Sequence, residues 1–253
     1  FSAIKIAVPD VGPIGVVFMR CFLGMILMFG ITMLAPSRSW PKTWREWAEL
    51  SIVGVLSTAL PFYLISYAEQ EISSSMTAIL MTSGPLAVIV LGHFFTDDEK
   101  INRGKLIGVG IGFGAAIYLL RGGFSEFNGG GIWHPLSAIG AALCYAVGGL
   151  MAKRLVGVSA EVIATMVLAV SAVVMVPFYL SADIPWLWTL DRNVMLALIW
   201  LGVMPSGLAF YLRYFLIKRS GYGFVSYVGY LIPLFAIVIG IVVLINTTIP
   251  ITM

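Results

Sequence analysis

The sequence predicts an all-α polytopic membrane protein with about ten transmembrane helices, arranged as two inverted repeats of five helices. The composition is the first observation behind this prediction. Of 253 residues, 60% are hydrophobic and 11% are charged, and the mean hydropathy is +0.99. Soluble domains carry about 25% charged residues, so this chain lacks the polar side chains that a water-facing surface needs. A net charge of +3 without a basic and aromatic patch argues against nucleic acid as a partner.

Long apolar runs are the second observation, because about 20 apolar residues span a bilayer as a helix. The chain begins inside such a run, at about 1–8, which we interpret as the end of an incomplete first helix. Eight further runs follow, at roughly 14–35, 47–68, 74–95, 104–121, 135–152, 160–181, 194–217 and 222–245. Nine segments are therefore visible, and a tenth helix is not recognisable in the sequence.

An internal repeat is the third observation. The phrase FYL occurs at 62–64 and again at 210–212, an offset of 148 residues, and Pro85 and Pro233 keep the same offset. This pattern predicts a first repeat at 1–122 and a second at 132–253, together forming one membrane domain. Other identities without a gap are Gly54/Gly202, Val55/Val203, Leu60/Leu208, Leu86/Leu234, Ile89/Ile237, Val90/Val238 and Gly92/Gly240.

The basic residues predict how the repeats are oriented, because loops that face the cytoplasm collect Lys and Arg. Alternate connectors divide them unequally. One side has Arg38, Lys42, Arg45, Lys100, Arg103, Lys105, Lys153, Arg154, Lys218 and Arg219, and the other has Lys5, Arg121 and Arg192. The equivalent residues Glu71 and Arg219 then lie on opposite sides. A repeat with an odd number of helices enters its second copy upside down, an arrangement typical of transporters.

Three segments resemble the EamA-type branch of the drug/metabolite transporter superfamily. They are MRCF at 19–22, the stretch from MTSGPLAV to AAIYLL at 81–120, and SAIGAALCYAVGGLMAKRL at 137–155. The resemblance implies ten helices in the cell inner (plasma) membrane, both ends in the cytoplasm, a small-molecule substrate and no cofactor. Length and aromatic content are most similar to YddG-type exporters of aromatic amino acids and methyl viologen.

The resemblance implies a small-metabolite exporter that works by alternating access, with amino acids (aromatic ones favoured) or aromatic cations as cargo. Alternatives are cargo of another class, such as sugar phosphates, and a channel-like or structural membrane protein. An enzyme is not expected, since no catalytic His/Asp/Ser group is visible at membrane depth. No metal site is expected either, because Cys21 and Cys144 match no ligand spacing. The oligomeric state is left open, and a monomer is compatible with the sequence.

Tyrosines are the candidate substrate-binding residues, because their rings stack on aromatic cargo or hold a cation. Pairs at helical spacing share one helix face. The tyrosines predicted to lie nearest the middle of the membrane, and Ser83 close to Pro85, are the favoured candidates and are given first in the list. The candidates are Tyr145, Tyr227, Tyr230, Ser83, Tyr63, Tyr67 and Tyr211.

Prolines are the candidate hinges, because each removes a backbone hydrogen bond and bends its helix. Pro85 and Pro233 lie near the middle of equivalent predicted helices, and Pro61 and Pro205 form a looser second pair. A static kink is the alternative interpretation.

Charged residues at membrane depth are the last consideration. All twelve acids fall at predicted helix ends or in connectors, so we expect a facilitator, or coupling through groups other than a buried acid. Lys5, Lys153 and Arg213 are expected to extend their basic groups toward water. On that expectation, phosphorylated cargo is disfavoured.

Overall fold

The computed structural model describes residues 2–36, 38–96, 100–120, 131–182, 184–185, 187–228 and 231. Within these residues the regular structure is entirely helical, which confirms the predicted all-α class. Six helical stretches are long and apolar enough to cross a membrane, so the protein is a multi-pass membrane protein. They are Ala3–Leu34, Trp44–Ala68, Ser74–Phe95, Trp133–Ala152, Ala160–Ser181 and Arg192–Ser220. The total of ten helices and the inverted arrangement remain predictions.

Helix α1 (Ser2–Leu34) contains the first two predicted segments. Its helical geometry is interrupted at Gly12, where φ is 63° and ψ is 175°. A side chain is strained at this positive φ, so glycine permits the break between Pro9 and Pro13. The interruption falls between the predicted runs at 1–8 and 14–35.

The third predicted segment is one continuous helix with a wider turn in its middle. It consists of α2 (Trp44–Gly54), the π-helical segment η1 (Val55–Ala59) and α3 (Leu60–Ala68). Thr43 caps α2: its hydroxyl accepts a hydrogen bond from the Glu46 amide, and the Glu46 carboxylate accepts one from the Thr43 amide.

The eighth predicted segment has the same construction. It consists of α9 (Arg192–Leu201), the π-helical segment η4 (Gly202–Leu208) and α10 (Ala209–Ser220). The Asp191 carboxylate caps α9 by accepting a hydrogen bond from the amide of Asn193. A π-helical turn is rare and is frequent at functional sites, so its occurrence in both segments draws attention to this part of the molecule.

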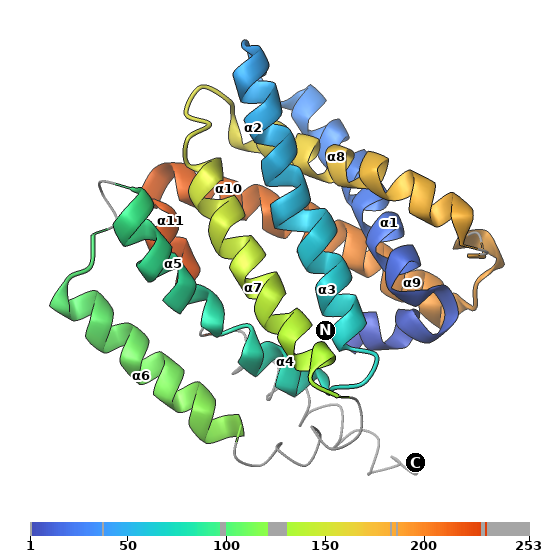
Figure 1. Cartoon of the computed structure of the whole chain (residues 1–253). Coiled ribbons are helices and arrows are strands. Elements are labelled where there is room, and N and C mark those ends of the chain that lie inside the picture. Colours follow the sequence, from blue (N-terminus) through green and yellow to red (C-terminus); the bar gives the residue numbers. More distant parts are fainter. Residues whose placement is uncertain are drawn as a thin grey trace, which may run out of the picture.

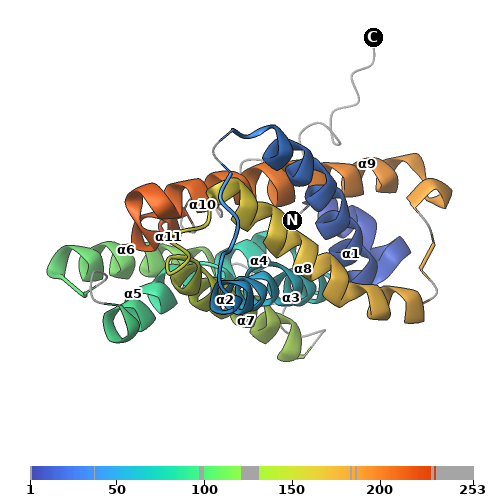
Figure 2. The same ribbon diagram turned by 90° about the horizontal axis from the view of Figure 1, so that it is seen from above.

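The remaining elements complete the bundle shown in Figures 1 and 2. Helix α6 lies at the edge of the bundle in both views, against α4 and α5. The start of the last predicted run, 222–245, forms α11, and residues 229–230 and 232–245 of that run, which include Tyr230 and Pro233, lie outside the described residues. These elements are α4 (Ser74–Leu80), α5 (Ser83–Phe95), α6 (Arg103–Leu120), α7 (Trp133–Ala152), α8 (Ala160–Ser181), η3 (Leu187–Thr189) and α11 (Tyr222–Ser226).

The helix starts recur at the offset of 148 residues that the sequence suggested. Trp44 begins α2 and Arg192 begins α9, and Ser74 begins α4 where Tyr222 begins α11. The packing is reciprocal: α2, η1 and α10 contact α8, whereas α9, η4 and α3 contact α1. Helices α1 and α8 also contact each other. Each π-helical segment thus packs against a helix from the other half of the chain.

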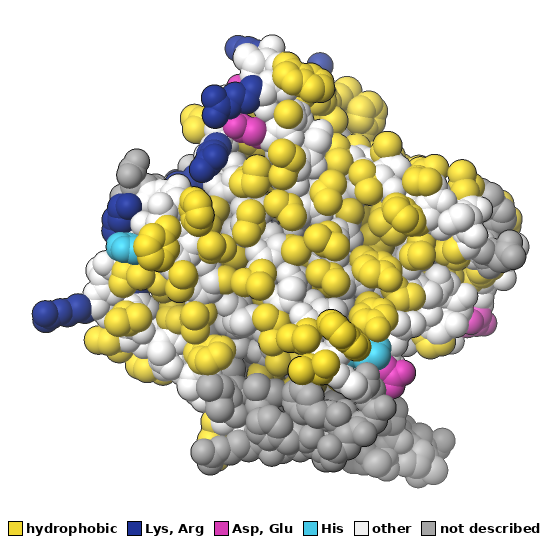
Figure 3. All heavy atoms as spheres, in the orientation of Figure 1, with side chains coloured by type: hydrophobic (Ala, Val, Ile, Leu, Met, Phe, Trp, Pro, Cys, Tyr) yellow, Lys and Arg dark blue, Asp and Glu magenta, His cyan; other side chains and the backbone are white. Residues whose placement is uncertain are grey.

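The surface matches a membrane environment. Hydrophobic side chains cover the middle of the face in Figure 3, and most of the visible Lys and Arg side chains lie toward the end at which α2 begins, with another at the left edge. Large apolar residues such as Ile111, Phe178 and Leu180 are more than half exposed. Lipid tails cover such side chains without the cost that water would impose.

Candidate functional site

A cavity of about 470 Å³ lies where the two halves of the chain meet. Cavities of this size hold small molecules in many proteins. Most of its lining is apolar, and its polar lining residues are two arginines, two tyrosines and one serine. The lining includes Arg20 of α1, Phe62 and Ile65 of α3, Pro85 of α5, Tyr145 of α7, Phe210 and Arg213 of α10, and Tyr222 and Ser226 of α11.

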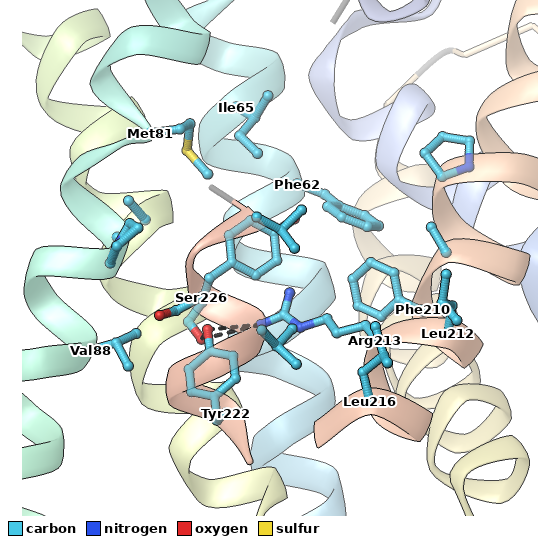
Figure 4. A pocket seen from close by; sticks show the side chains of 18 of the residues that line it. Phe62, Ile65, Met81, Val88, Phe210, Leu212, Arg213, Leu216, Tyr222 and Ser226 are labelled. Atoms are coloured by element: carbon cyan, nitrogen blue, oxygen red, sulfur yellow. Dashed lines mark hydrogen bonds between the residues drawn. The ribbon is translucent and has the colours of Figure 1, made fainter. Parts of the chain in front are cut away.

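The phenylalanines of the two FYL phrases form the wall at the contact between the halves (Figure 4). The Phe62 and Phe210 rings lie 5.6 Å apart between centroids and meet edge to face. This is a favourable geometry for an aromatic pair. Both side chains are buried. The first residues of the two FYL phrases are therefore in contact with each other. The sequence analysis missed this contact because it considered the tyrosines instead.

Arg20 projects from α1 and is 5% exposed. The centre of its guanidinium lies 3.5 Å from the centroid of the Phe62 ring. Its Nε donates a hydrogen bond to Ser206 Oγ of η4 over 2.9 Å. An aromatic face attracts a guanidinium, and the attraction strengthens away from water. Arg20 is thereby held between the first half and the π-helical segment of the second.

Arg213 projects from α10 toward Tyr222 of α11 (Figure 4). Its Nη2 donates to the Tyr222 hydroxyl over 3.1 Å and to the Tyr145 backbone carbonyl over 3.3 Å. The Tyr222 hydroxyl donates to the same Tyr145 carbonyl over 2.6 Å. The guanidinium also lies 4.9 Å from the Tyr145 ring centroid and 5.6 Å from that of Phe210.

Glycine at position 149 of α7 makes room for this arrangement. A Cβ built on Gly149 would overlap the ring atoms of Tyr222. The Tyr222 ring therefore packs directly on the α7 backbone, with its hydroxyl at the Tyr145 carbonyl and at Arg213.

The expectation that Arg213 extends toward water is wrong. Its guanidinium is enclosed by the rings of Tyr145, Phe210 and Tyr222, and its Nε is buried without an acceptor among the described residues. The distance from a helix end, on which the expectation rested, does not reveal where neighbouring helices converge. A signal was nevertheless present: Arg20 and Arg213 are the basic residues that remain inside helices once the connectors are counted.

The structure places the predicted substrate-binding residues in several different locations. Tyr145 lines the cavity. Tyr63 stacks on Tyr67, which in turn stacks on His134, and none of these three lines it. The others outside its lining are Tyr211, which packs near Phe215, Tyr227, and Ser83, whose hydroxyl donates to the Leu80 carbonyl. Tyr230 lies outside the described residues.

Three of the predicted hinge prolines fall at irregular points of their helices. Pro85 lines the cavity, and the helical stretch that contains it is interrupted at residues 81–82, one turn earlier. Pro61 is the second residue of α3, just after η1, and Pro205 lies inside η4 and also lines the cavity. Since a proline removes the hydrogen bond to the preceding turn, these interruptions have a local cause. Their role as hinges stays a prediction.

Two acids are buried among the described residues: Glu161 in the first turn of α8, and Glu69, whose position is the connector that the sequence predicted. Glu69 follows α3 and is 2% exposed. Ser74 Oγ donates to its Oε2 over 2.7 Å, while its Oε1 has no partner among the described residues. Burial raises the pKa of the Glu69 carboxyl, and the hydrogen bond from Ser74 offsets part of this increase. The sequence argument overlooked that a connector can itself be buried.

The protein is a helical membrane protein with a mostly apolar cavity, lined by aromatic rings and a few polar groups, between its two halves. This architecture is typical of small-molecule transporters. The comparisons agree. The profile of the EamA-like transporter family matches residues 1–121 and again 132–252. The chain therefore belongs to the EamA-like transporter family, which is part of the drug/metabolite transporter superfamily.

Two relatives carry the name of transporters. An uncharacterized transporter of Archaeoglobus fulgidus is 22% identical over 237 residues, which cover 93% of this chain and 81% of the relative. The uncharacterized transporter YoaV of Bacillus subtilis is 23% identical over 152 residues, 60% of this chain and 51% of that protein. A solved crystal structure with 20% sequence identity matches the fold with a TM-score of 0.72, over 94% of this chain and 83% of the other. The family and these names indicate a transporter rather than an enzyme, with a small-molecule substrate and a lipid bilayer as partners.

Proposed function

We infer that the protein is a carrier that binds one small molecule in the cavity between its halves and exports it by alternating access. The observation that carries this inference is the Phe62–Phe210 contact, which joins equivalent positions of the two halves at the cavity wall. A cargo bound there touches both halves at once. A rocking movement of one half against the other then opens the cavity to either side in turn.

The inverted arrangement of the halves is part of this proposal. Support comes from the reciprocal packing of α1 and α8 against the opposite half, and from the family profile that matches each half separately. The distribution of Lys and Arg supports an inner-membrane orientation with both ends in the cytoplasm. Pro85 and Pro205 at the cavity suit the hinges of such a movement.

Amino acids, and aromatic ones in particular, are the cargo that we propose. The rings of Phe62, Phe210 and Tyr145 offer edges and faces to an aromatic side chain, an interaction of about 0.5–1.5 kcal/mol for each ring pair. The guanidinium groups of Arg20 and Arg213 suit its carboxylate. The same two cations oppose an aromatic cation such as methyl viologen, since like charges repel at close range.

Counterflow in proteoliposomes tests the carrier function. Vesicles loaded with unlabelled phenylalanine should accumulate external labelled phenylalanine transiently and saturably, because a carrier exchanges one cargo for another. Protein-free vesicles provide the control. Flux that rises linearly with concentration and shows no counterflow would instead support the channel-like alternative.

A further inference from the structure

The cavity contains two positive charges that the described protein does not neutralise. Arg20 and Arg213 both line it, and neither forms an ion pair with a carboxylate within the described residues. The ion pair that is present there joins Arg45 and Glu49, outside the cavity lining. Burying a charge without a partner is costly in a membrane protein, so such a residue indicates function by default.

The partners that the two guanidinium groups do have leave several donors unused. A guanidinium carries five N–H groups. Arg20 uses Nε for Ser206, and among the described residues nothing accepts from its two terminal nitrogens. Arg213 uses Nη2 for Tyr145 and Tyr222, while its Nε is buried without an acceptor there. The remaining neighbours are aromatic rings, which attract a cation but accept no strong hydrogen bond.

The architecture does not require either arginine. At the offset of 148 residues, the position of Arg20 corresponds to Leu168, and that of Arg213 corresponds to Ile65. Both apolar residues are buried, and the helices that contain them pack in the reciprocal manner described above. Equivalent helix positions are therefore filled by aliphatic side chains in one half and by a cation in the other.

We propose that Arg20 and Arg213 together bind the anionic group of the cargo, so that the cavity selects small organic anions with an apolar or aromatic body. This proposal rests on the carrier function inferred above and adds the charge that the cargo must bear. A carboxylate or a phosphate accepts the unused N–H groups and neutralises the guanidinium charge. Each arginine comes from a different half, so the anion also links the two halves.

The Phe62–Phe210 pair places the two cations around the same space. The Arg20 guanidinium lies over the Phe62 ring, the Arg213 guanidinium lies near the Phe210 ring, and these two rings are in contact. The apolar side chains of Ile65, Met81 and Val88 are among the other residues of the lining and can contact an aromatic body (Figure 4).

A series of four compounds with one phenyl ring and different charged groups tests the proposal on the full chain in detergent and in proteoliposomes. They are 3-phenylpropionate, phenylalanine, phenethylamine and phenyl phosphate. We expect 3-phenylpropionate to bind at least tenfold more tightly than phenethylamine. Equal or tighter binding of phenethylamine to the unaltered chain would overturn the proposal without any substitution. Preference for phenyl phosphate over 3-phenylpropionate would assign the anion as a phosphate, and the reverse preference as a carboxylate.

Replacing each arginine by the equivalent residue of the other half tests the contribution of that arginine to binding. Arg20→Leu and Arg213→Ile should each weaken binding of 3-phenylpropionate at least tenfold and should leave phenethylamine unchanged or bound more tightly. Arg213→Lys should retain part of the preference, because it keeps the charge. Arg219→Leu, an exposed position at the end of the same helix, is the matched control and should behave as the unaltered chain.

The outcomes separate this proposal from the carrier function. Saturable counterflow that is insensitive to both substitutions and to the charge of the compound would overturn anion selection and leave the carrier function standing. If none of the four compounds showed saturable counterflow, while folding was verified by size-exclusion chromatography, the carrier function itself would be contradicted.

Discussion

In the described residues, the two halves of the molecule share a succession of helices but have different buried charges. Both halves have a capped helix that passes through a π-helical segment into an FYL phrase, at an offset of 148 residues. The buried charges break this equivalence. Arg20 and Glu69 in the first half correspond to Leu168 and Ile217 in the second, and Arg213 in the second half corresponds to Ile65 in the first.

This difference separates what folding requires from what function requires. Aliphatic side chains satisfy the packing at each of these equivalent positions, since Leu168, Ile217 and Ile65 are all buried. A charge there adds a desolvation cost without a corresponding packing gain. The buried charges are therefore the residues to examine for transport, and the equivalent backbone features are those to examine for stability.

The largest expected effect concerns the crossing of α1 and η4. A Cβ at Gly24 would lie 2.9 Å from the Gly202 carbonyl oxygen, whereas Ala172 occupies the equivalent place on α8. Gly24→Val should lower the free energy of unfolding in detergent by about 2 kcal/mol through overpacking. Gly30→Val on the same helix is the control, because no described atom lies within 4 Å of a Cβ there. Equal destabilisation by the two variants would contradict the close crossing.

The next effect concerns Tyr222, whose equivalent in the first half is Ser74. Gly149→Ala should displace the Tyr222 ring and its hydrogen bond to Arg213, and so weaken binding of 3-phenylpropionate about tenfold. Gly140→Ala on the same helix meets Leu64 at an ordinary 3.5 Å and should leave the affinity unchanged. Titration calorimetry measures both. An unchanged affinity in Gly149→Ala would mean that the Tyr222 position does not matter for binding.

A smaller effect should distinguish the equivalent hydroxyls of the two π-helical segments. The Thr58 hydroxyl of η1 is hydrogen bonded to Ser171 and to the Val167 carbonyl of α8, whereas the equivalent Ser206 accepts from Arg20. Thr58→Val should cost about 1 kcal/mol of stability and leave cargo affinity unchanged. Ser206→Ala should mainly change affinity, since it releases the Arg20 side chain. Thermal unfolding and cargo binding would be measured on both variants. Equal changes of stability and of affinity in Thr58→Val and Ser206→Ala would contradict this contrast.

The smallest effect is a pH dependence that arises from Glu69. Because burial raises the pKa of its carboxyl in the folded protein, folding favours the protonated form. The resulting stability is fully present below the pKa of the unfolded chain and is lost as the pH rises through the raised pKa. Glu69→Gln should remove this dependence in detergent unfolding measured across the acidic range, with the exposed Glu71→Gln as the control. A profile that Glu69→Gln leaves unaltered would assign the dependence to another group.

The bilayer explains why so much of the fold was predictable. A spanning helix needs a long apolar run, and its length, composition and flanking turns are local properties. The predicted runs at 74–95 and 160–181 agree with the structure to within a residue or two, and the offset of 148 residues matches the helix starts. The break at Gly12 was likewise visible as a gap between two runs.

The site was less predictable, because it depends on which helix faces converge. Tyr145 was predicted among the candidates nearest mid-depth, but nothing local distinguishes it from Tyr227 of the same group, which lies outside the cavity lining. Phe62 and Phe210 were visible as a repeat, but not as a contact. Arg213 was assigned to water because a long basic side chain near a helix end usually reaches it, and only the packing of α7, α10 and α11 shows otherwise.

The sidedness of two equivalent connector positions tests the inverted arrangement most directly. Cys21 and Cys144 would first be replaced by serine, and single cysteines would then be introduced by Glu71→Cys and by Arg219→Cys, both at exposed sites. A membrane-impermeant maleimide applied to intact cells should label the Glu71→Cys variant. It should label the Arg219→Cys variant only after permeabilisation. Labelling of both variants from the same side would contradict two halves of opposite orientation, and the alternating-access account with them.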